Sequence, residues 1–350
     1  MQTDWQQFLQ QQGAVWEGDH PAHFGNREHE LSHRNGDVLM SLHELAVIRA
    51  AGQDARKFLL SQFTNDVNLV SPETFQLNGY CSAKGRLLAL MWVAQRGDEF
   101  LLILPRNILD PTLKRLRMFV LNAKVSLDDA SSRWIALGCA GPGAAAAIEP
   151  LAGKKLEKPG AAVSTQSMLF MRMPGIANRF IVLGGSDPVT DGAAAGAWRE
   201  LARTQQAVTA EVWANLEVES GLPYIAPATI DEFVPQMVNL EQIGGLSFTK
   251  GCYPGQEIVA RTQYRGQIKR RMILLHGSGN TPPQPGEKIY SGGNMENAAG
   301  RVVRAAPRSP TEFSLLAVIE NEKRTQPLHL AASPHATLEL MNLPYTVDTD

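Results

Sequence analysis

The sequence has little cysteine and no strong excess of charge of either sign. It holds 3 cysteines in 350 residues, and 33 Lys and Arg residues against 35 Asp and Glu residues. Cys81, Cys139 and Cys252 lie far apart and form no Cys-x-x-Cys pair, which argues against a disulfide framework, a zinc knuckle and a self-contained iron–sulfur site. Because the net charge is only −2, an acidic ligand or nucleic acid would have to meet a local basic patch.

Long hydrophobic runs are also missing. The longest apolar stretches, such as 87–94, are far too short to span a bilayer, and the first twelve residues lack the pattern of a secretory signal. We therefore expect a cytoplasmic protein without a membrane partner. Apolar residues make up 44% and charged residues 19% of the chain, which indicates a globular protein, and the length predicts two or three folding units.

Apolar periodicity and turn residues predict a mixed α+β structure through residue 271. The first series of expected elements is a strand at 45–51, a helix at 54–63, strands at 75–81, 86–95 and 99–104, and a helix at 111–122. The second series is a strand at 133–138, a helix at 143–151, strands at 167–173 and 179–184, and a helix near 190–204. These series predict two α+β layers of antiparallel sheet, each with helices on one face.

The pattern changes after residue 271. From 277 to 350, glycine- and proline-rich turns separate short apolar runs, which is typical of a small all-β barrel or sandwich. We therefore place a domain boundary here, with one module at 1–271, in which one subdomain lies mainly at 45–130, and a β-barrel at 272–350.

The densest chemical signal is the segment 250–257, KGCYPGQE. Glycines on both sides of Cys252 allow turn conformations and the close approach of a ligand, so we expect an exposed thiol on a flexible bend at the mouth of a cavity. Residues 250–271 contain one acid, Glu257, and six basic residues, which together give a charge of +5: Lys250, Arg261, Arg265, Lys269, Arg270 and Arg271. Positive charge favours a thiolate, which makes Cys252 a candidate nucleophile, metal ligand or redox group. The structural alternative is a small buried side chain beside a solvated basic face.

This segment, preceded by NLEQIGGLSF and followed by ARTQYRG, closely resembles the signature of the YgfZ-type folate-binding proteins, relatives of the glycine-cleavage T-protein, an aminomethyltransferase. The likeness is strongest over 208–275. Two further runs are similar to family motifs: 58–67 (FLLSQFTNDV) to an early helix-and-turn motif, and 216–223 (LEVESGLP) to the folate-pocket helix. The resemblance implies a T-protein-like module of two interleaved α+β subdomains around a central hole that holds tetrahydrofolate, plus a C-terminal β-barrel.

The resemblance also implies a function and partners. It indicates a folate-binding accessory protein for the synthesis or repair of iron–sulfur clusters, with client enzymes such as a tRNA methylthiotransferase. Cys252 would be the catalytic group, with Lys250 and Tyr253 beside it, and no resident metal is expected. Tyr253 either stacks on a planar ligand or packs the turn.

Five residues are candidates for binding the folate. Glu219 aligns with the pterin-binding glutamate of the T-protein, and Glu217 lies two residues before it. Because residues two apart on a helix face different ways, at most one of the two should point into the hole. Arg261 and Arg265 could bind the anionic glutamate tail, and Gln256 could bind the ligand or fix the loop of Cys252. Ordinary exposed glutamates and a solvated basic face are the structural alternatives.

One departure from the T-protein bears on activity. The T-protein has a Gly-Gly-Ile-x-Asp-Asp run that supplies a carboxylate near the reactive folate nitrogen, whereas the matching stretch 85–90 has Ala89-Leu90 in place of the acids. Classical aminomethyl transfer is therefore not expected. Two other functions stay open: a tetrahydrofolate-dependent one-carbon transferase or demethylase, and a module that makes weak tRNA contacts through the basic segment.

Overall fold

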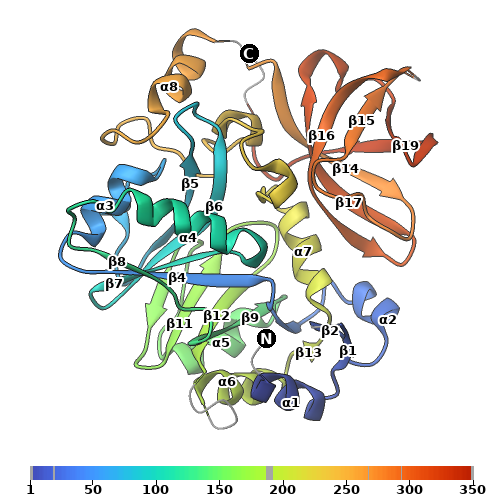
Figure 1. The fold of residues 1–350 in the computed structure, drawn as a ribbon. Helices are drawn as coiled ribbons and strands as arrows, with labels where there is room; N and C mark the ends of the chain where they lie inside the picture. Colours follow the sequence, from blue (N-terminus) through green and yellow to red (C-terminus); the bar gives the residue numbers. More distant parts are fainter. Residues whose placement is uncertain (1–2, 19, 187–191, 267, 293, 348–350) are drawn as a thin grey trace.

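The computed structural model describes residues 3–18, 20–186, 192–266, 268–292 and 294–347, and the statements below concern these residues. Its elements form two β-sheets with covering helices and, beside them, a closed barrel (Figure 1). The predicted α+β class and the C-terminal β-barrel are confirmed. Of the helices in the described part of the chain, none is long and apolar enough to cross a membrane.

A six-stranded sheet forms the subdomain that carries the N-terminus. Its strands, in spatial order, are β10 (Ala162–Ser164), β11 (Met168–Met173), β12 (Arg179–Gly185), β9 (Trp134–Ala140), β3 (Val38–Ser41) and β13 (Gln206–Ala207). One face is covered by α1 (Thr3–Gln11), α5 (Ala144–Ala152) and α6 (Ala193–Leu201), which bury Trp5, Phe8 and Trp198 against it. The helix expected near 190–204 is thus observed from Ala193, and residues 187–191 lie outside the described residues.

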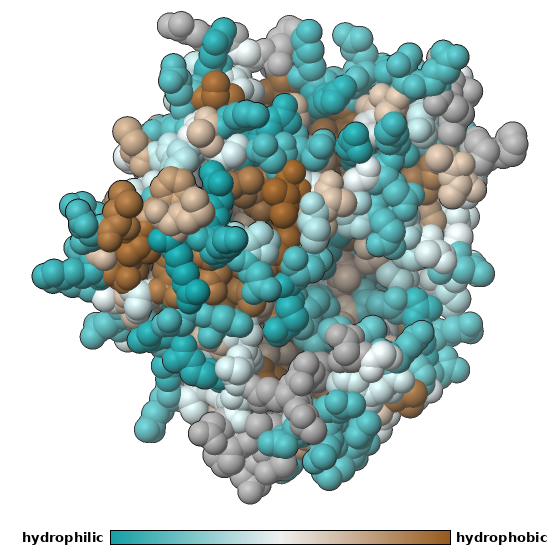
Figure 2. Space-filling model, viewed as in Figure 1, coloured by the Kyte–Doolittle hydropathy of each residue, from teal (hydrophilic) through white to brown (hydrophobic). Residues whose placement is uncertain are grey.

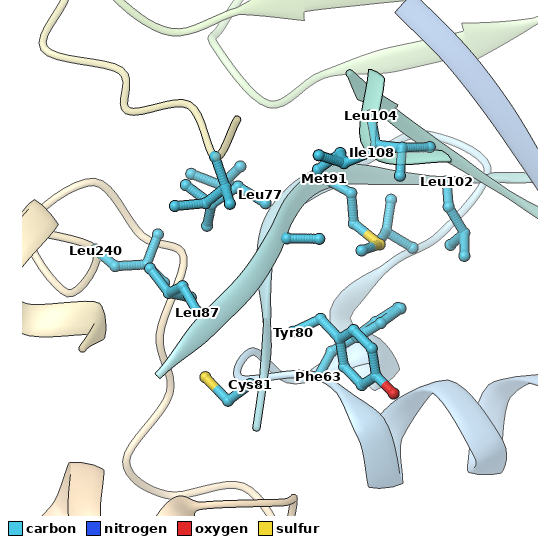
Figure 3. Packing of buried hydrophobic residues seen from close by; sticks show 14 of the residues in the cluster. Phe63, Leu77, Tyr80, Cys81, Leu87, Met91, Leu102, Leu104, Ile108 and Leu240 are labelled. Carbon is cyan, nitrogen blue, oxygen red and sulfur yellow. The ribbon is translucent and has the colours of Figure 1, made fainter. Parts of the chain in front are cut away.

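A five-stranded antiparallel sheet forms the other subdomain. Its spatial order is β5 (Phe75–Cys81), β6 (Leu87–Arg96), β7 (Glu99–Pro105), β4 (Leu45–Ala51) and β8 (Ser126–Asp129). The outer face packs under α3 (Ala55–Gln62) and α4 (Leu109–Met118), with the short helices η1 (Val67–Leu69) and η2 (Arg106–Ile108) beside them. Figure 3 shows this core, where Phe63 lies beside Tyr80 and Leu87 beside Leu240.

The two sheets pack face to face. Alternate residues of the five-stranded sheet, such as Val47, Leu101 and Ile103, join Met171 and Ile181 of the six-stranded sheet in one buried cluster. Because the side chains of a strand alternate between its faces, each sheet buries one face against the other sheet and one against its helices. This is the layer arrangement that the sequence predicts.

One predicted helix ends early. The helix expected at 111–122 is α4, which stops at Met118, and Leu121 beyond it has a positive φ of 45° and is 86% exposed. The exposed Met118 and Phe119 lie next to it in the chain. Figure 2 shows apolar side chains gathered on this side of the molecule, while polar residues cover most of the remaining face.

The closed barrel follows at the C-terminal end. Its strands, in order around the barrel, are β14 (Arg270–Ser278), β17 (Glu312–Glu320), β16 (Asn294–Ser309), β15 (Lys288–Ser291), β18 (Leu328–Leu330) and β19 (Ser333–Met341), with η5 (Asn321–Lys323) after β17. The first strand begins at Arg270, close to the boundary placed at 271, and the independent folding of 1–271 and 272–350 stays a prediction. Met272, Leu274 and Leu316 face outward from the barrel and join the core of the five-stranded sheet.

Helix α7 (Ala210–Glu219) runs through the middle of the molecule, between the sheets and the barrel (Figure 1). The hairpin of β1 (Val15–Glu17) and β2 (His20–His23) and the short helix α2 (Arg27–Ser32) lie at its N-terminal end. Beyond α7, residues 220–255 hold only the short helices η3 (Pro227–Thr229) and η4 (Pro235–Val238), and α8 (Gln256–Arg265) then precedes the barrel.

Candidate functional site

Lys250 anchors the loop that carries Cys252. Its side chain is buried, and Nζ donates hydrogen bonds to the carbonyl oxygens of Leu60 and Phe63, the latter at 2.6 Å. Nζ also lies 4.8 Å from the centre of the Tyr253 ring. Burial lowers the pKa of Lys250 to about 8, although the negative charges of Asp66 and of a Cys252 thiolate act in the opposite direction. The lysine thus fixes the loop to the end of α3.

Gly255 fixes the other end of this loop. It has a φ of 79° and directly precedes α8. A Cβ at this position would overlap the backbone of Ser82 and Gly85, in the turn between β5 and β6. Gly255 thus takes a turn conformation of the kind expected from the glycines and serves close packing of the loop against the turn, while the flexibility of the bend stays a prediction. The sequence analysis also missed α8 itself.

The 58–67 motif and the chain leading to Cys252 meet in space. Thr64 Oγ1 donates to the carbonyl of Gly245 at 2.7 Å, and Asn65 Nδ2 donates to that of Gly244 at 2.7 Å. The backbone N–H of Ser247 donates to the carbonyl of Thr64 at 3.0 Å. The two sequence motifs most distant from each other in the resemblance thus build one structural unit.

Cys252 itself is exposed, unlike the other two cysteines. Cys81 and Cys139 are buried, and burial raises the pKa of each thiol to about 12, so they are the packing residues that the sequence predicts. Cys252 has the access that a reacting thiol needs. The sequence predicts this thiol at the mouth of a cavity. Neither of the two central cavities described below has Cys252 in its wall.

Two of the six basic residues near Cys252 are paired with carboxylates. Arg270 pairs with Glu320 at 2.6 Å and Arg271 is buried against Glu241, while Lys250 donates to carbonyls. Arg261 and Lys269 are exposed, whereas the side chain of Arg265 lies outside the described residues. Because two of these charges are compensated by acids, the charge of +5 counted along the chain overstates the positive potential at the thiol.

Tyr253 and Gln256 support the loop. Tyr253 is 7% exposed and packs into the core of the five-stranded sheet, so its ring packs the turn, and burial raises the pKa of its hydroxyl. The backbone N–H of Gln256 donates to the carbonyl of Tyr253 at 3.2 Å, and the half-buried Gln256 opens α8. Neither contact involves the thiol.

Glu217 and Glu219 both bind the barrel, although their spacing on α7 predicts different directions. Glu217 Oε2 lies 2.6 Å from Arg304 Nη1 of β16. Glu219 Oε1 accepts a hydrogen bond from Ser314 Oγ at 2.6 Å and lies 2.8 Å from His276 Nε2. Burial disfavours the charge of Glu219, but these two hydrogen bonds, together with the charges of His276 and Arg308, outweigh it and lower its pKa. Both carboxylates have partners in the barrel because the barrel packs against the last turn of α7.

Two cavities open beside the crossing between the two sheets, and the larger of them also touches the barrel. One, of about 370 Å³, lies between Trp5 and η2, and the other, of about 560 Å³, lies between the β1–β2 hairpin, α7 and the barrel. His43 and Glu44 are the two residues that line both. These volumes are in the range of small-molecule sites.

Glu44 is a chemically distinct residue that the sequence analysis missed. Burial raises the pKa of its carboxyl to about 7, against the opposing charge of Arg304. In the sequence it is a single acid directly before the strand expected at 45–51, and nothing local distinguishes it. Its significance comes from the crossing of the chain from β3 of one sheet to β4 of the other.

Ala89 and Leu90, which replace the acid pair of the T-protein, are buried at 0% and 4% exposure. They contribute to the same apolar cluster as Leu87 and Tyr253. A carboxylate in this position would be desolvated. Ala89 and Leu90 therefore contribute packing here and no acid.

Comparison with known proteins places the chain in a family. No family model matches it. It is 30% identical to the tRNA-modifying protein YgfZ of Escherichia coli O139:H28 (strain E24377A / ETEC), over 93% of this chain and 98% of that protein. It is 31% identical to the protein of the same name from Escherichia coli O45:K1 (strain S88 / ExPEC), with the same coverage of 93% and 98%.

A solved structure confirms the fold. The glycine cleavage system aminomethyltransferase T of Bartonella henselae superposes with a TM-score of 0.74, covering 97% of this chain and 96% of that one at 13% identity. This likeness shows a T-protein fold, and the sequence identity to the relatives shows the family. The chain belongs to the YgfZ family, as its KGCYPGQE segment indicates.

Proposed function

We propose that this chain is a folate-binding accessory protein for the synthesis or repair of iron–sulfur clusters, including those of enzymes that modify tRNA. It acts in the cytoplasm, and the Cys252 thiol is its reacting group. The observation that carries the proposal is the contrast among the cysteines, since Cys252 alone of the three is exposed. Its loop is clamped by Lys250 and Gly255, as a site that must present one atom in a fixed position requires.

The cofactor in this proposal is tetrahydrofolate. The T-protein fold and the two central cavities support it, since the larger cavity of about 560 Å³ can hold a bicyclic ring and part of its tail. Arg261 and Arg265 remain candidates for the anionic tail. Ala89 and Leu90 count against a classical aminomethyltransferase.

An involvement in tRNA modification is supported by the name of the E. coli relatives. In this proposal the client is an iron–sulfur enzyme such as a tRNA methylthiotransferase, and direct tRNA contact is weak. The burial of Lys250 and the ion pairs of Arg270 and Arg271 favour this order, because these three cations are not free to bind phosphates.

The test is replacement of Cys252 in cells that depend on this protein. Cys252→Ser should remove the activity of iron–sulfur enzymes under oxidative stress and reduce the methylthiolation of tRNA. Cys139→Ala, at a buried thiol, is the matched control and should retain both. Full activity of the Cys252→Ser cells would exclude the thiol mechanism.

Thiol labelling of the purified protein provides a second measurement. In the native state, iodoacetamide should modify one thiol, identified by mass spectrometry as Cys252, and the two buried thiols should react only after unfolding. Labelling of Cys81 or Cys139 at the same rate as Cys252 would remove the contrast on which the proposal rests.

A further inference from the structure

Leu121, in the turn after α4, combines two unfavourable features. It has a positive φ of 45°, a left-handed conformation that costs a residue other than glycine free energy, and its side chain is 86% exposed. An asparagine would tolerate this conformation better and would expose no apolar side chain to water. Met118 and Phe119 beside it are 64% and 40% exposed, and Figure 2 shows apolar side chains gathered in the region of α3 and α4. A strained, exposed leucine within an apolar cluster indicates a site of interaction.

This turn is held in place at both of its ends. Arg117, in the last turn of α4, donates through Nε and Nη2 to the carbonyl of Leu127 in β8, at 2.9 and 2.7 Å. The backbone N–H of Lys124 donates to Asp54 Oδ2 at 2.8 Å, and the N–H of Asp54 donates to the carbonyl of Lys124 at 3.1 Å. The exposed position of Leu121 is therefore a fixed feature of the fold.

Basic residues surround the apolar cluster. Residues 109–125 contain one acid, Asp110, and four basic residues: Lys114, Arg115, Arg117 and Lys124. Among the described residues, none of these four forms an ion pair with a carboxylate, whereas two arginines near Cys252 do. The cluster therefore keeps its positive charge. We name these four basic residues, together with Met118, Phe119 and Leu121, the α4 patch.

The α4 patch and Cys252 lie at opposite ends of α3. Lys124 is bound to Asp54, which directly precedes α3. The Cys252 loop is held on the carbonyls of Leu60 and Phe63, at the other end of this helix. The helix has 8 residues, so its ends are about 12 Å apart. One protein partner of ordinary size covers such a distance within a single interface.

The chemistry of the α4 patch favours an acidic protein surface over other partners. Aliphatic side chains such as Leu121 and Met118 do not stack on bases, as recognition of single-stranded RNA requires. The apolar face of α4, with Leu113 and Leu116, is buried in the core and is not free to enter a lipid surface as an interfacial helix does. A second copy of the chain, docked patch to patch, would bring like charges together.

We propose that the α4 patch docks the protein on which Cys252 acts, through a surface of that partner in which carboxylates surround an apolar pocket. Leu121 and Met118 enter the pocket, and the basic residues pair with its acidic rim. This inference rests on the proposed function of Cys252 and assigns the surface that recognises the partner. Three apolar side chains and four cations make a small interface, which suits a partner that must leave after each reaction.

The experiment compares variants in cells that depend on this protein, with the activity of iron–sulfur enzymes under oxidative stress as the readout. Leu121→Asn, and separately Lys114→Glu combined with Lys124→Glu, should lower this activity by about ten-fold at the normal level of the protein. Overproduction of either variant should restore the activity because mass action compensates for weaker docking, whereas overproduced Cys252→Ser should stay inactive. Leu340→Asn, at an exposed leucine of the barrel, is the matched control and should retain full activity.

Two measurements on the purified variants separate docking from folding. Leu121→Asn should unfold at the same temperature as the unmodified chain or a higher one, since asparagine relieves the left-handed strain. Iodoacetamide should label Cys252 at an unchanged rate in this variant, because a small reagent needs no docking surface. A structural role of Leu121 would instead lower the unfolding temperature.

The outcomes separate the inference from the function on which it rests. If Cys252→Ser removes activity and the patch variants retain it, or lose it without rescue by overproduction, the docking surface is overturned while the thiol function stands. If Cys252→Ser retains full activity, the proposed function is wrong and the inference falls with it. Weaker binding of total tRNA, or of vesicles containing phosphatidylglycerol, to Leu121→Asn than to the unmodified chain would assign the patch to RNA or lipid instead. A dimer that is lost in this variant would assign it to a second copy.

Discussion

The loop of Cys252 and the junction between α7 and the barrel bury charged side chains in different ways. In the loop, Lys250 binds backbone carbonyls and Tyr253 packs beneath it, so the neighbouring thiol stays at the surface. At the junction, Glu217 is closed off by an arginine and Glu219 by a serine and a histidine of the barrel. The nearby Glu44 instead lines a cavity.

The comparison shows that several residues singled out in the sequence, such as Lys250, Glu217 and Glu219, hold parts of the structure in place. Lys250 fixes its loop through backbone carbonyls and needs no carboxylate partner. The neighbouring Cys252 stays exposed. Buried ion pairs, in contrast, join two parts of the molecule and neutralise each other. The two regions therefore place Cys252 and Glu44 in opposite environments, one at the surface and one in the wall of a cavity.

The junction should be the more sensitive region. Arg304→Met leaves Glu217 and Glu44 in a buried site without their cation, and we expect a loss of about 3 to 5 kcal/mol in the free energy of unfolding. Urea denaturation followed by fluorescence measures it. The double variant Arg304→Met with Glu217→Leu should recover much of this loss, because it removes the stranded charge. A loss below about 1 kcal/mol in the single variant would contradict the pairing.

Replacing the anchor of the Cys252 loop should cost less stability, since Lys250 binds neutral carbonyls and its loss leaves no unpaired charge. Lys250→Met preserves the length of the side chain but leaves the carbonyls of Leu60 and Phe63 without their donor, so we expect a loss of about 2 to 3 kcal/mol. Urea denaturation measures the loss, and the rate of iodoacetamide labelling should change because Cys252 is no longer held. Arg270→Met, at a more exposed pair, is the matched control, with about 0.5 kcal/mol expected. Equal losses in the two variants would contradict the anchoring role.

The sequence predicts the layers well because apolar periodicity reports burial on one face. Four strands of the five-stranded sheet, β4 to β7, appear where the pattern places them, as does the barrel after residue 271, whereas β8 was not predicted. The helix α4 ends earlier than its pattern, since Leu121 takes a left-handed conformation that leads into β8. The strand β3 was missed because its short apolar run 38–41 is buried on both sides and has no alternation.

The site was predicted less completely, and for a different reason. The exposure of Cys252 follows from local glycines, whereas the burial of Lys250 depends on carbonyls of residues 60 and 63, which no local pattern reveals. Likewise, the partners of Glu217 and Glu219 come from the barrel, and Glu44 gains its role from the crossing between sheets. Contacts between segments that are distant in the sequence decide which charged residues have hydrogen-bond or ion-pair partners.

The remaining effect, at Glu44, has the opposite sign, because a substitution should stabilise the chain. Because burial raises its folded pKa to about 7, above its ordinary value of 4.5, folding is penalised progressively as the pH rises between these values. Glu44→Gln removes the penalty, so without ligand it should be more stable than the unmodified chain by about 2 kcal/mol at pH 6 and about 3 kcal/mol at pH 8, and equally stable near pH 4. Urea denaturation at pH 4.5, 6 and 8 measures the difference, in which the titration of all other groups cancels. A variant less stable at pH 8 would mean that the carboxylate is already satisfied within the protein, and the contrast between an open cavity acid and the closed pairs of α7 would then fail.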